Sequence, residues 1–426
     1  MAYPESDFLI GASDVLVINK WKTEKSMKKI RLLIIGLVSI FVTSACSDFL
    51  EEKSQDEVLV RTAKDYDELL LGFMYNTNSY LMLYAMDDDI RINEARLTGS
   101  ESGTLKKYSG CFTWQPDMWE RSSTLDDGYK YSYTQIMGIN AVLDGIDEAV
   151  GTKEEREIVK ANALGMRGFY YFMLVNLFGE PYNDNKKALG VPIKLTAGLV
   201  ENGMPRNTVE EVYEQIVKDL KAASDLFEKY PKQTGNYHIN VTVVNIWLSR
   251  IYLYMERWEE AIAAAGKAIE TAEGLTDYTR VEGTFVMASY DHSEVEWVYG
   301  SNTVITNFAP STELYSSYGN DDQRRKLWFS AALEVVKKKV STTSPTSTVR
   351  ISEAYLNRAE AYVQSKKDEE ALNDLNELRR YRIVGYEDES ITDSKKLLDE
   401  IRLERRLELC FDQHRWFDLR RYGMPS

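Results

Sequence analysis

Aromatic side chains are the residues of this chain whose number and placement point most directly to binding chemistry. The 426 residues include 27 tyrosines and 8 tryptophans, a high proportion for a sequence with only 9 prolines and 24 glycines. Rigid Tyr and Trp rings can cover the apolar C–H faces of a sugar at low entropic cost, while carboxylates, amides and arginines hold the hydroxyls around its edge. Ring stacking on a ligand is therefore the first chemistry to consider.

Two segments that lack helical periodicity, 84–134 and 282–348, hold the aromatic residues best suited to this role. Loops on a rigid scaffold are where binding residues usually lie. We expect the ligand to be contacted by Trp114, Trp119, Tyr315 and Tyr318. Packing in the core is the alternative for each of these rings. Trp297 is assigned to the core, because it alternates with Val295 and Tyr299 as in a short strand.

Other site chemistries have little support in the sequence. The three histidines are far apart, so a histidine-based zinc site is not expected. No Gly-x-Ser-x-Gly, His-Glu-x-x-His or phosphate-binding glycine loop is present. The carboxylates of Asp87–Asp89 could bind calcium, but the sequence around them lacks the spacing of an EF-hand loop. We therefore interpret them as a solvated acidic turn. We therefore expect no metal and no cofactor. The net charge of −15 also argues against nucleic-acid binding.

The N-terminal residues have the pattern of a targeting signal. Basic residues at 28, 29 and 31 are followed by eleven apolar or small residues, too few to span a membrane, and then by small residues that end at Cys46. This pattern predicts a lipoprotein signal peptide over 27–45, with Cys46 as the lipidated first residue of the mature chain. Residues 46–60 are acidic and polar, which indicates a tether. Residues 1–26 do not fit a signal, and we interpret them as a spurious N-terminal extension ahead of Met27.

Residues 61–426 have the composition and patterning of a helical body. Apolar residues make up 44 % of the chain, which excludes disorder as the main state. The stretch 154–178 predicts a long helix, and its small residues at 161, 165 and 168 would allow another helix to approach closely. The stretch Thr208–Glu211 has the spacing of a capping box and predicts the start of another helix. We predict an all-α fold.

Two segments read as copies of one repeat, 245–269 and 355–378. In each, a first helix ends near a tyrosine, at 252 or 362, and a short turn leads to Glu-Glu-Ala. This spacing is typical of tetratricopeptide repeats, in which an alanine begins the tight packing of the second helix. Ordinary helical hairpins are the alternative. Among the other helical residues, we expect Arg167 to form an ion pair and His414 to pack in the core.

Several motifs together resemble the SusD/RagB family of nutrient-binding outer-membrane lipoproteins. They are Cys46–Leu50, Ala163–Phe172 with its continuation to Gly179, Arg206–Tyr213, the segment 350–379, and the stretch Ile401–Leu409 followed by Arg415–Arg421. The combination of Glu-Arg-Arg with Arg-Trp-Phe-Asp-Leu-Arg in the last motif is quite specific. We expect the arginines and glutamates of 401–421 to form charge-paired networks that fasten this segment to other helices.

The resemblance implies a body of about four tetratricopeptide-like helix pairs with a loop-rich ligand-binding part. It implies a lipid anchor that holds the protein on the outer membrane at the cell surface. It further implies capture of oligosaccharides without catalysis, and delivery to a SusC-type TonB-dependent transporter as partner. Family members usually continue beyond a point equivalent to Ser426 into a proline-rich tail, so we expect a truncated or shortened C-terminus.

Two other functions stay open on the sequence. A glycoside hydrolase or another enzyme would need as few as two suitably placed carboxylates, and the 67 acidic residues neither support nor exclude such a pair. A repeat module that only holds a protein partner would need no ligand site at all. Glycan binding without hydrolysis would distinguish the nutrient-binding lipoprotein from the enzyme and from the repeat module.

Overall fold

The computed structural model describes residues 60–74, 80–96, 101–119, 128–283, 285–300, 307–330, 332–333 and 347–424. All of them belong to the unit Val60–Ser426. The N-terminal extension, the signal peptide, Cys46 and all but the last residue of the tether lie outside the described residues, so those assignments stay predictions.

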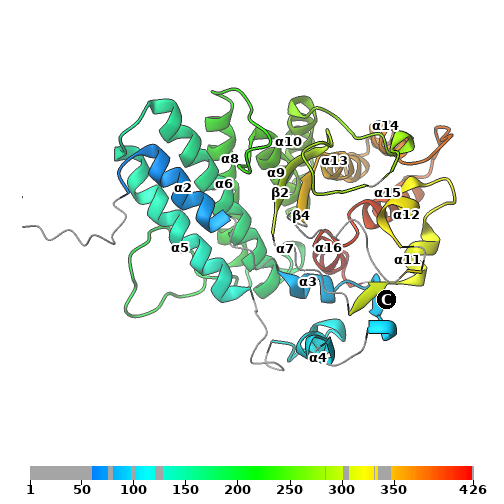
Figure 1. Cartoon of the computed structure of the whole chain (residues 1–426), viewed down its shortest axis with the longest axis horizontal. Helices are drawn as coiled ribbons and strands as arrows, with labels where there is room; N and C mark the ends of the chain where they lie inside the picture. The colour runs from blue at the N-terminus through cyan, green and yellow to red at the C-terminus, as the bar shows by residue number, and fades with distance from the viewer. Residues whose placement is uncertain are drawn as a thin grey trace, which may run out of the picture. The chain divides into compact units, whose positions relative to one another are not determined.

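Most of the described chain is helical (Figure 1). The helices are α2 (Ala63–Met74), α3 (Leu81–Ala85), α4 (Glu101–Phe112), α5 (Tyr129–Gly145), α6 (Lys153–Phe178), α7 (Tyr182–Asn185), α8 (Val209–Phe227), α9 (Val241–Tyr254), α10 (Trp258–Thr271), α11 (Thr312–Ser317), α12 (Gln323–Trp328), α13 (Ser352–Gln364), α14 (Asp368–Arg380), α15 (Ser394–Glu408) and α16 (Arg415–Arg421). The strands are β1 (Ile90–Ile92), β2 (Val295–Tyr299), β3 (Phe308–Pro310) and β4 (Ser347–Arg350). The predicted all-α class is confirmed, with a few short strands added. None of the described helices combines the length and apolar character needed to cross a membrane.

Several helices, α6, α8 and α9 among them, begin where a side chain can accept a hydrogen bond from an otherwise unpaired backbone N–H group. The predicted capping box of α8 is present, with Thr208 and Glu211 each accepting from the other's backbone. Helix α6 starts with an equivalent box formed by Thr152 and Glu155. A single asparagine, Asn240, caps α9.

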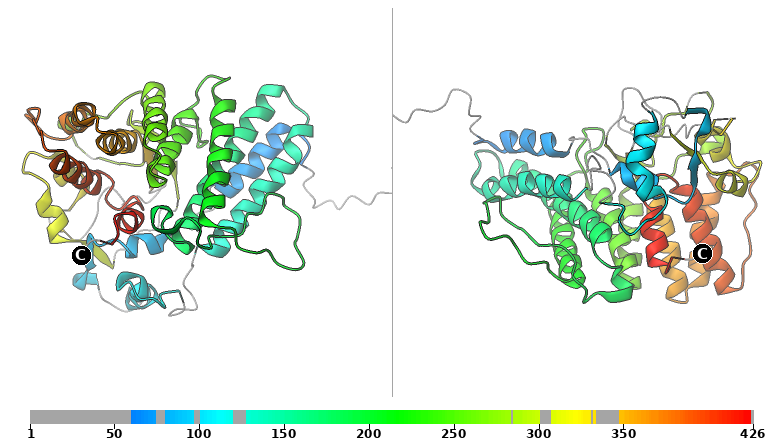
Figure 2. Two further views of the ribbon diagram at one scale, coloured as in Figure 1. Left: turned by 180° about the vertical axis from the view of Figure 1, so that it is seen from behind. Right: turned by 90° about the horizontal axis from the view of Figure 1, so that it is seen from below.

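The long helices form a continuous array in which each packs on the next. The order is α2, α5, α6, α8, α9, α10, α13 and α14 (Figures 1 and 2). Helix α6 is buried along almost its whole length from Val159 to Leu177. The predicted close approach is confirmed at Gly168, where an added Cβ would lie 2.9 Å from Cγ of Leu220 on α8. Glycine is therefore needed there for the two helices to pack at this distance.

The two predicted repeat copies are two adjacent helix pairs. The first pair is α9 with α10 and the second is α13 with α14, and α10 packs on α13 between them. The alanines that were expected to allow tight packing, Ala261, Ala265, Ala268 and Ala371, are completely buried. The array is consistent with a tetratricopeptide-like body.

Two small antiparallel sheets lie within the segments predicted to be irregular. Strand β1 pairs with β3, and β2 pairs with β4. Strand β2 coincides with the predicted strand at Val295–Tyr299, and Trp297 is buried there as expected. The description of 84–134 and 282–348 as loop-like is wrong in part, because they also contain α4, α11 and α12. The last two helices span only six residues each, too few to produce a visible helical period.

A buried ionic network joins the C-terminal motif to the rest of the body. Its centre is Glu408 on α15, whose carboxylate accepts hydrogen bonds from Arg324, Arg350 and Arg382. Arg382 also pairs with Glu294 at 2.8 Å. All five side chains are buried. Burial alone would raise the pKa of Glu408, but Arg382 and Arg350 hold it well below its usual value. The predicted charge-paired role of this motif is confirmed.

A second group of buried charges connects α9, α13, α15 and α16. Arg405 donates to Asp418 at 2.7 Å, and Arg250 donates to Glu353 at 2.6 Å. His414 lies 3.9 Å from Glu353 and is buried, as predicted. Burial, with a contribution from Arg250, lowers the pKa of His414 to about 3. His414 is therefore a packed, neutral side chain at physiological pH.

The network around Glu408 predicts a large loss of stability when its charge is removed. Glu408→Gln leaves three buried arginines without their shared carboxylate, so we expect the free energy of unfolding to fall by about 3–5 kcal/mol in urea denaturation. The matched control is Glu313→Gln, because Glu313 also pairs with an arginine but its side chain is 78 % exposed. That control should cost less than about 1 kcal/mol. A loss for Glu408→Gln as small as that of the control would show that the network does not stabilise the fold.

His414 predicts a specific pH dependence of stability. Its folded pKa lies below the unfolded value of about 6.5, so the unfolded state takes up a proton first as the pH falls and stability is lost below that value. Between about pH 7 and about pH 5 this group should lower the free energy of unfolding by roughly 2 kcal/mol. His414→Asn should remove that part of the decline, as measured by urea titrations at each pH. Equal declines in wild type and variant would contradict the assignment.

Candidate functional site

Six aromatic side chains on or next to α4, α5, α6 and α16 form two groups of ring contacts, which we call together the aromatic rim. In the first group, Trp114 contacts Trp416 at 5.6 Å between ring centroids. The second group consists of Trp119, Tyr129, Tyr133 and Phe178, with ring contacts of 4.9–5.3 Å. Two of these rings, Trp114 and Tyr129, are each 37 % exposed, and the other four are partly buried. The rim therefore combines exposed ring surface with packed support beneath it.

Trp114 follows the end of α4 and is held in one orientation by three features. Its indole N–H donates to the Met86 carbonyl at 3.0 Å, and its ring packs on Trp416 at 5.6 Å. Its backbone has a positive φ of 49°, which is uncommon for a bulky residue and persists only where surrounding contacts hold it. An exposed, immobilised indole of this kind loses little entropy when a ligand stacks on it.

The second part of the rim is built around Phe178 at the end of α6. Trp119 contacts Phe178 at 5.3 Å, and Tyr129 contacts it edge-on at 5.2 Å. Tyr129 also contacts Tyr133, whose hydroxyl donates to the Pro192 carbonyl at 2.6 Å. The rings of this part therefore pack on one another, and the residues that carry three of them lie on the long helices α5 and α6.

Arg420 links the two parts of the rim. It lies on α16, the helix that carries Trp416, and donates to the carbonyl of Gly179 at 2.7 Å. Gly179 directly follows Phe178, so this hydrogen bond fixes the spacing between the Trp416 and Phe178 ends. We treat the two parts, each with one of the predicted tryptophans, as one candidate site. Tyr129 belongs to the suitable aromatic residues of 84–134, although it is not among the four expected to contact the ligand. Phe178 and Trp416 are not predicted as site residues from the sequence.

The two predicted tyrosines do not join the rim. Tyr318 is only 2 % exposed, and its hydroxyl donates to the Leu407 carbonyl at 2.8 Å. Its assignment as a ligand platform is wrong, because the ring packs under α15 instead of facing solvent. Tyr315 on α11 is partly buried, and the guanidinium of Arg325 lies 4.4 Å from its ring centroid. Arginine thus occupies the kind of position over a ring that a sugar would need.

The acidic turn at 87–89 is also different from the prediction. Asp87 and Asp89 are buried, so the turn is not solvated as a whole. Asp88 accepts two hydrogen bonds from Arg415 at 2.6 and 2.7 Å, and Asp89 accepts from Arg406. The three carboxylates do lie close together, but two arginines supply the positive charge there. The cluster fastens the chain before β1 to α15 and α16, next to Trp416.

The rim has the chemical properties of a binding surface more than those of a reaction centre. It presents neutral rings, and two arginines beside it, Arg415 and Arg420, are already engaged by Asp88 and by backbone carbonyls. Two exposed ionisable residues, Asp117 and Lys130, are neighbours of rim residues in the sequence. Arg167, which we expected to be structural, forms a buried pair with Asp219 at 2.7 Å and takes no part in the rim. The exposed rings of the rim can therefore stack on the flat apolar face of a ligand.

Two family models and several solved structures match this chain. A family model described as "Starch-binding associating with outer membrane" matches residues 48–253, and a second, described as "SusD family", matches residues 257–426. No curated protein matches the chain significantly. Similar solved structures include a SusD-like carbohydrate binding protein from Bacteroides vulgatus, with 24 % identity, a TM-score of 0.67, and coverage of 85 % of this chain and 84 % of that one.

Two further structures show the same fold. A SusD superfamily protein from Bacteroides vulgatus has 21 % identity, a TM-score of 0.69, and coverage of 85 % and 89 % of the two chains. A laminarin binding SusD-like protein has 19 % identity, a TM-score of 0.65, and coverage of 85 % and 92 %. At these identities the similarity establishes the fold alone.

The placement of Tyr318 predicts an effect on stability without an effect on ligand binding. Tyr318→Phe removes the hydroxyl that satisfies the buried Leu407 carbonyl, so the free energy of unfolding should fall by about 1 kcal/mol in urea denaturation. Retention of the variant on glycan-containing native gels should equal that of wild type. Reduced retention with unchanged stability would instead support the original assignment of Tyr318 to the ligand.

Proposed function

The chain belongs to the SusD/RagB family, and we propose on that basis that it is a cell-surface glycan-binding lipoprotein. In this proposal the lipid on Cys46 anchors the chain to the outer membrane. The folded body captures an oligosaccharide and delivers it to a SusC-type TonB-dependent transporter, without catalysing any reaction.

The observation that carries the proposal is the immobilised, exposed ring of Trp114. Sugars offer apolar C–H faces that fit a flat indole, and a preorganised ring binds them with little loss of conformational freedom. Tyr129, which is equally exposed, supplies a second ring in the same rim. We assign Trp114, Trp119 and Tyr129 to direct ligand contact, with Trp416 and Phe178 as the rings on which they rest.

The family description and one related structure guide the choice of ligand. The family model that matches residues 48–253 is described as starch-binding, and one structure with the same fold belongs to a laminarin binding protein. Both ligands are glucans, whose repeated rings can span more than one aromatic side chain. We therefore propose glucan oligosaccharides as the first ligand class to test.

The absence of catalysis is part of the proposal. Glycoside hydrolysis needs two carboxyl groups flanking the scissile bond, one of them able to donate a proton. Asp117, between Trp114 and Trp119, supplies one exposed carboxylate in this part of the chain. Asp412 and Asp418, the described carboxylates nearest to Trp416 in the sequence, are both buried in pairs with Arg350 and Arg405. Carboxylates held in this way fasten helices instead of facing a substrate.

The proposed function predicts that the tryptophans are needed for binding and dispensable for folding. Trp114→Ala combined with Trp119→Ala should abolish retention on native gels containing laminarin or starch. The melting temperature should fall only modestly, because Trp114 is 37 % exposed and Trp119 is only partly buried. Tyr237→Ala is the matched control, since Tyr237 is also exposed but lies far along the chain from the rim. Unchanged retention of the double variant would refute the rim as the binding site.

The same protein samples test the absence of catalysis. Wild-type protein that retains a glucan should release no reducing ends from it during prolonged incubation. A steady increase in reducing ends that persists through further purification would favour the hydrolase instead.

A further inference from the structure

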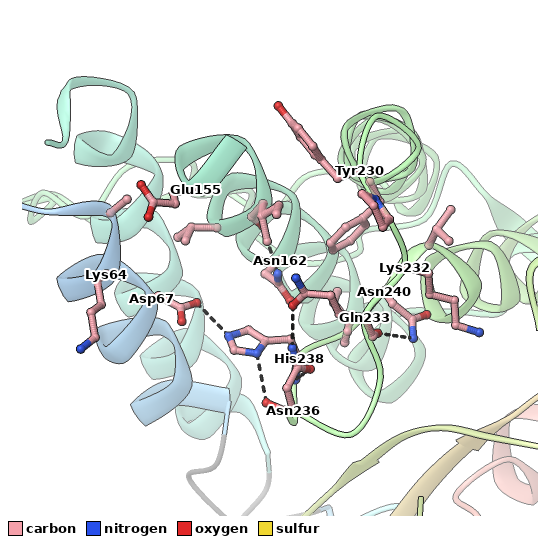
Figure 3. Close-up of a pocket in the computed structure, with 17 residues that line it drawn as sticks. Lys64, Asp67, Glu155, Asn162, Tyr230, Lys232, Gln233, Asn236, His238 and Asn240 are labelled. Atoms are coloured by element: carbon pink, nitrogen blue, oxygen red, sulfur yellow. Dashed lines mark hydrogen bonds and ion pairs between the residues drawn. The ribbon is translucent and has the colours of Figure 1, made fainter. Parts of the chain in front are cut away.

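A cavity of about 280 Å³ lies beside the first half of α6, whereas Phe178 of the aromatic rim is the last residue of that helix. It is enclosed by α2, the first half of α6, the end of α8 and the segment 230–241 that leads into α9 (Figure 3). An engineered apolar cavity of about 150 Å³ is enough to bind benzene. The cavity is therefore large enough for a molecule of one or two rings.

The walls of the cavity are mainly apolar. Ile158 and Val159 face it from α6, Phe227 closes it from α8, and Ile239 and Val241 line it from the segment before and at the start of α9. Contact with these side chains would remove apolar ligand surface from water, which favours binding in proportion to the area covered. A ligand with a hydroxyl on nearly every carbon would match such walls poorly.

The ionisable side chains at the mouth are already paired with other protein groups. Asp67 lies 2.8 Å from Nε2 of His238, which closes the gap between α2 and the 230–241 segment (Figure 3). Lys232 pairs with Glu296 at 2.9 Å, and Glu155 is held in the capping box of α6. The remaining lysine, Lys64, lies 3.6 Å from Glu68. The mouth therefore offers no unbalanced charge that would select an ionic ligand.

Asn162 is the exception among the polar side chains of the cavity. It is completely buried, and its amide N–H group donates to the Ile158 carbonyl at 3.0 Å. Its side-chain oxygen Oδ1 has no hydrogen-bond partner among the described residues. A buried acceptor without a partner costs about 1–3 kcal/mol. Asn162 is one of the side chains that line the cavity, as Figure 3 shows.

We propose that this cavity is a second binding site, which takes a small neutral ring compound with a single hydrogen-bond donor. The apolar walls hold the ring, and the hydroxyl or N–H group of the compound donates to Oδ1 of Asn162. Phenols and indoles have this combination of properties, whereas glycans do not.

The site is independent of glycan capture. Asn162 and Phe178 lie sixteen residues apart on α6, which corresponds to about 24 Å along the helix axis. No residue of the aromatic rim lines the cavity. A ligand could therefore occupy each site at the same time, and one site can be removed by mutation without touching the other.

Isothermal titration calorimetry of the purified full chain with indole and 1-methylindole tests the proposal. Indole should bind saturably, and about fivefold more tightly than 1-methylindole, because only indole can donate to Asn162. Asn162→Leu should lower the affinity for indole to that for 1-methylindole. Ile158→Trp places a larger ring in the cavity from a partly buried position. It should weaken the binding of both compounds about tenfold or more.

Two controls separate this site from others. Met137→Trp adds the same ring at an exposed position on α5 and should leave binding of both compounds unchanged. Trp114→Ala with Trp119→Ala should also leave it unchanged, so failure of the glycan proposal would not affect this result. No saturable heat with wild type, equal affinity for the two compounds, or undiminished binding by folded Ile158→Trp would each overturn the proposal. If Ile158→Trp fails to fold, the comparison of the two compounds on wild type decides.

Discussion

The carboxylate of Glu408 is enclosed by three arginines that come from three separate parts of the chain: α12, β4 and the turn after α14. A buried ion of either sign is costly unless it is paired and hydrogen-bonded, so each of these elements must be in place for the others to be stable. The constraint explains why the Glu-Arg-Arg motif occurs where it does. On α15, Glu404 and Glu408 are one helical turn apart and both pair with Arg324. Arg405 points to other partners, Asp418 on α16 and Asn357 on α13.

The aromatic rim depends on this arrangement of charges. Helix α16 carries Trp416 and is fastened by Arg405 to Asp418, by Arg415 to Asp88 and by Arg420 to the end of α6. Trp114 rests on Trp416 and bonds to the chain just before Asp87. The exposed ring is therefore positioned by ion pairs and backbone contacts, of which the Arg405–Asp418 pair is buried. The neutral ring of Trp114 thus packs on a helix that ion pairs hold in place. Such a preorganised ring loses little conformational freedom when a ligand binds.

Much of the scaffold could be predicted from the sequence because its signals are local. The capping box at Thr208, the small residues of α6 and the alanines of the two repeat pairs each constrain residues within a few turns of themselves. The site was harder to predict, because its geometry depends on long-range contacts. Tyr318 and Trp114 both occur in segments without helical period, yet one packs under α15 and the other remains exposed on Trp416. Likewise, nothing near Asp89 in the sequence indicates that Arg406 would neutralise it.

The central claim is that a glycan covers the ring of Trp114, and hydroxyl-radical footprinting by mass spectrometry measures this directly. Oxidation of Trp114 and Tyr129 should fall markedly when the full chain is saturated with a glucan that it retains, while oxidation of the exposed Met137 on α5 stays the same. Unchanged oxidation of Trp114 in the saturated protein, with protection appearing at rings outside the rim, would contradict the account.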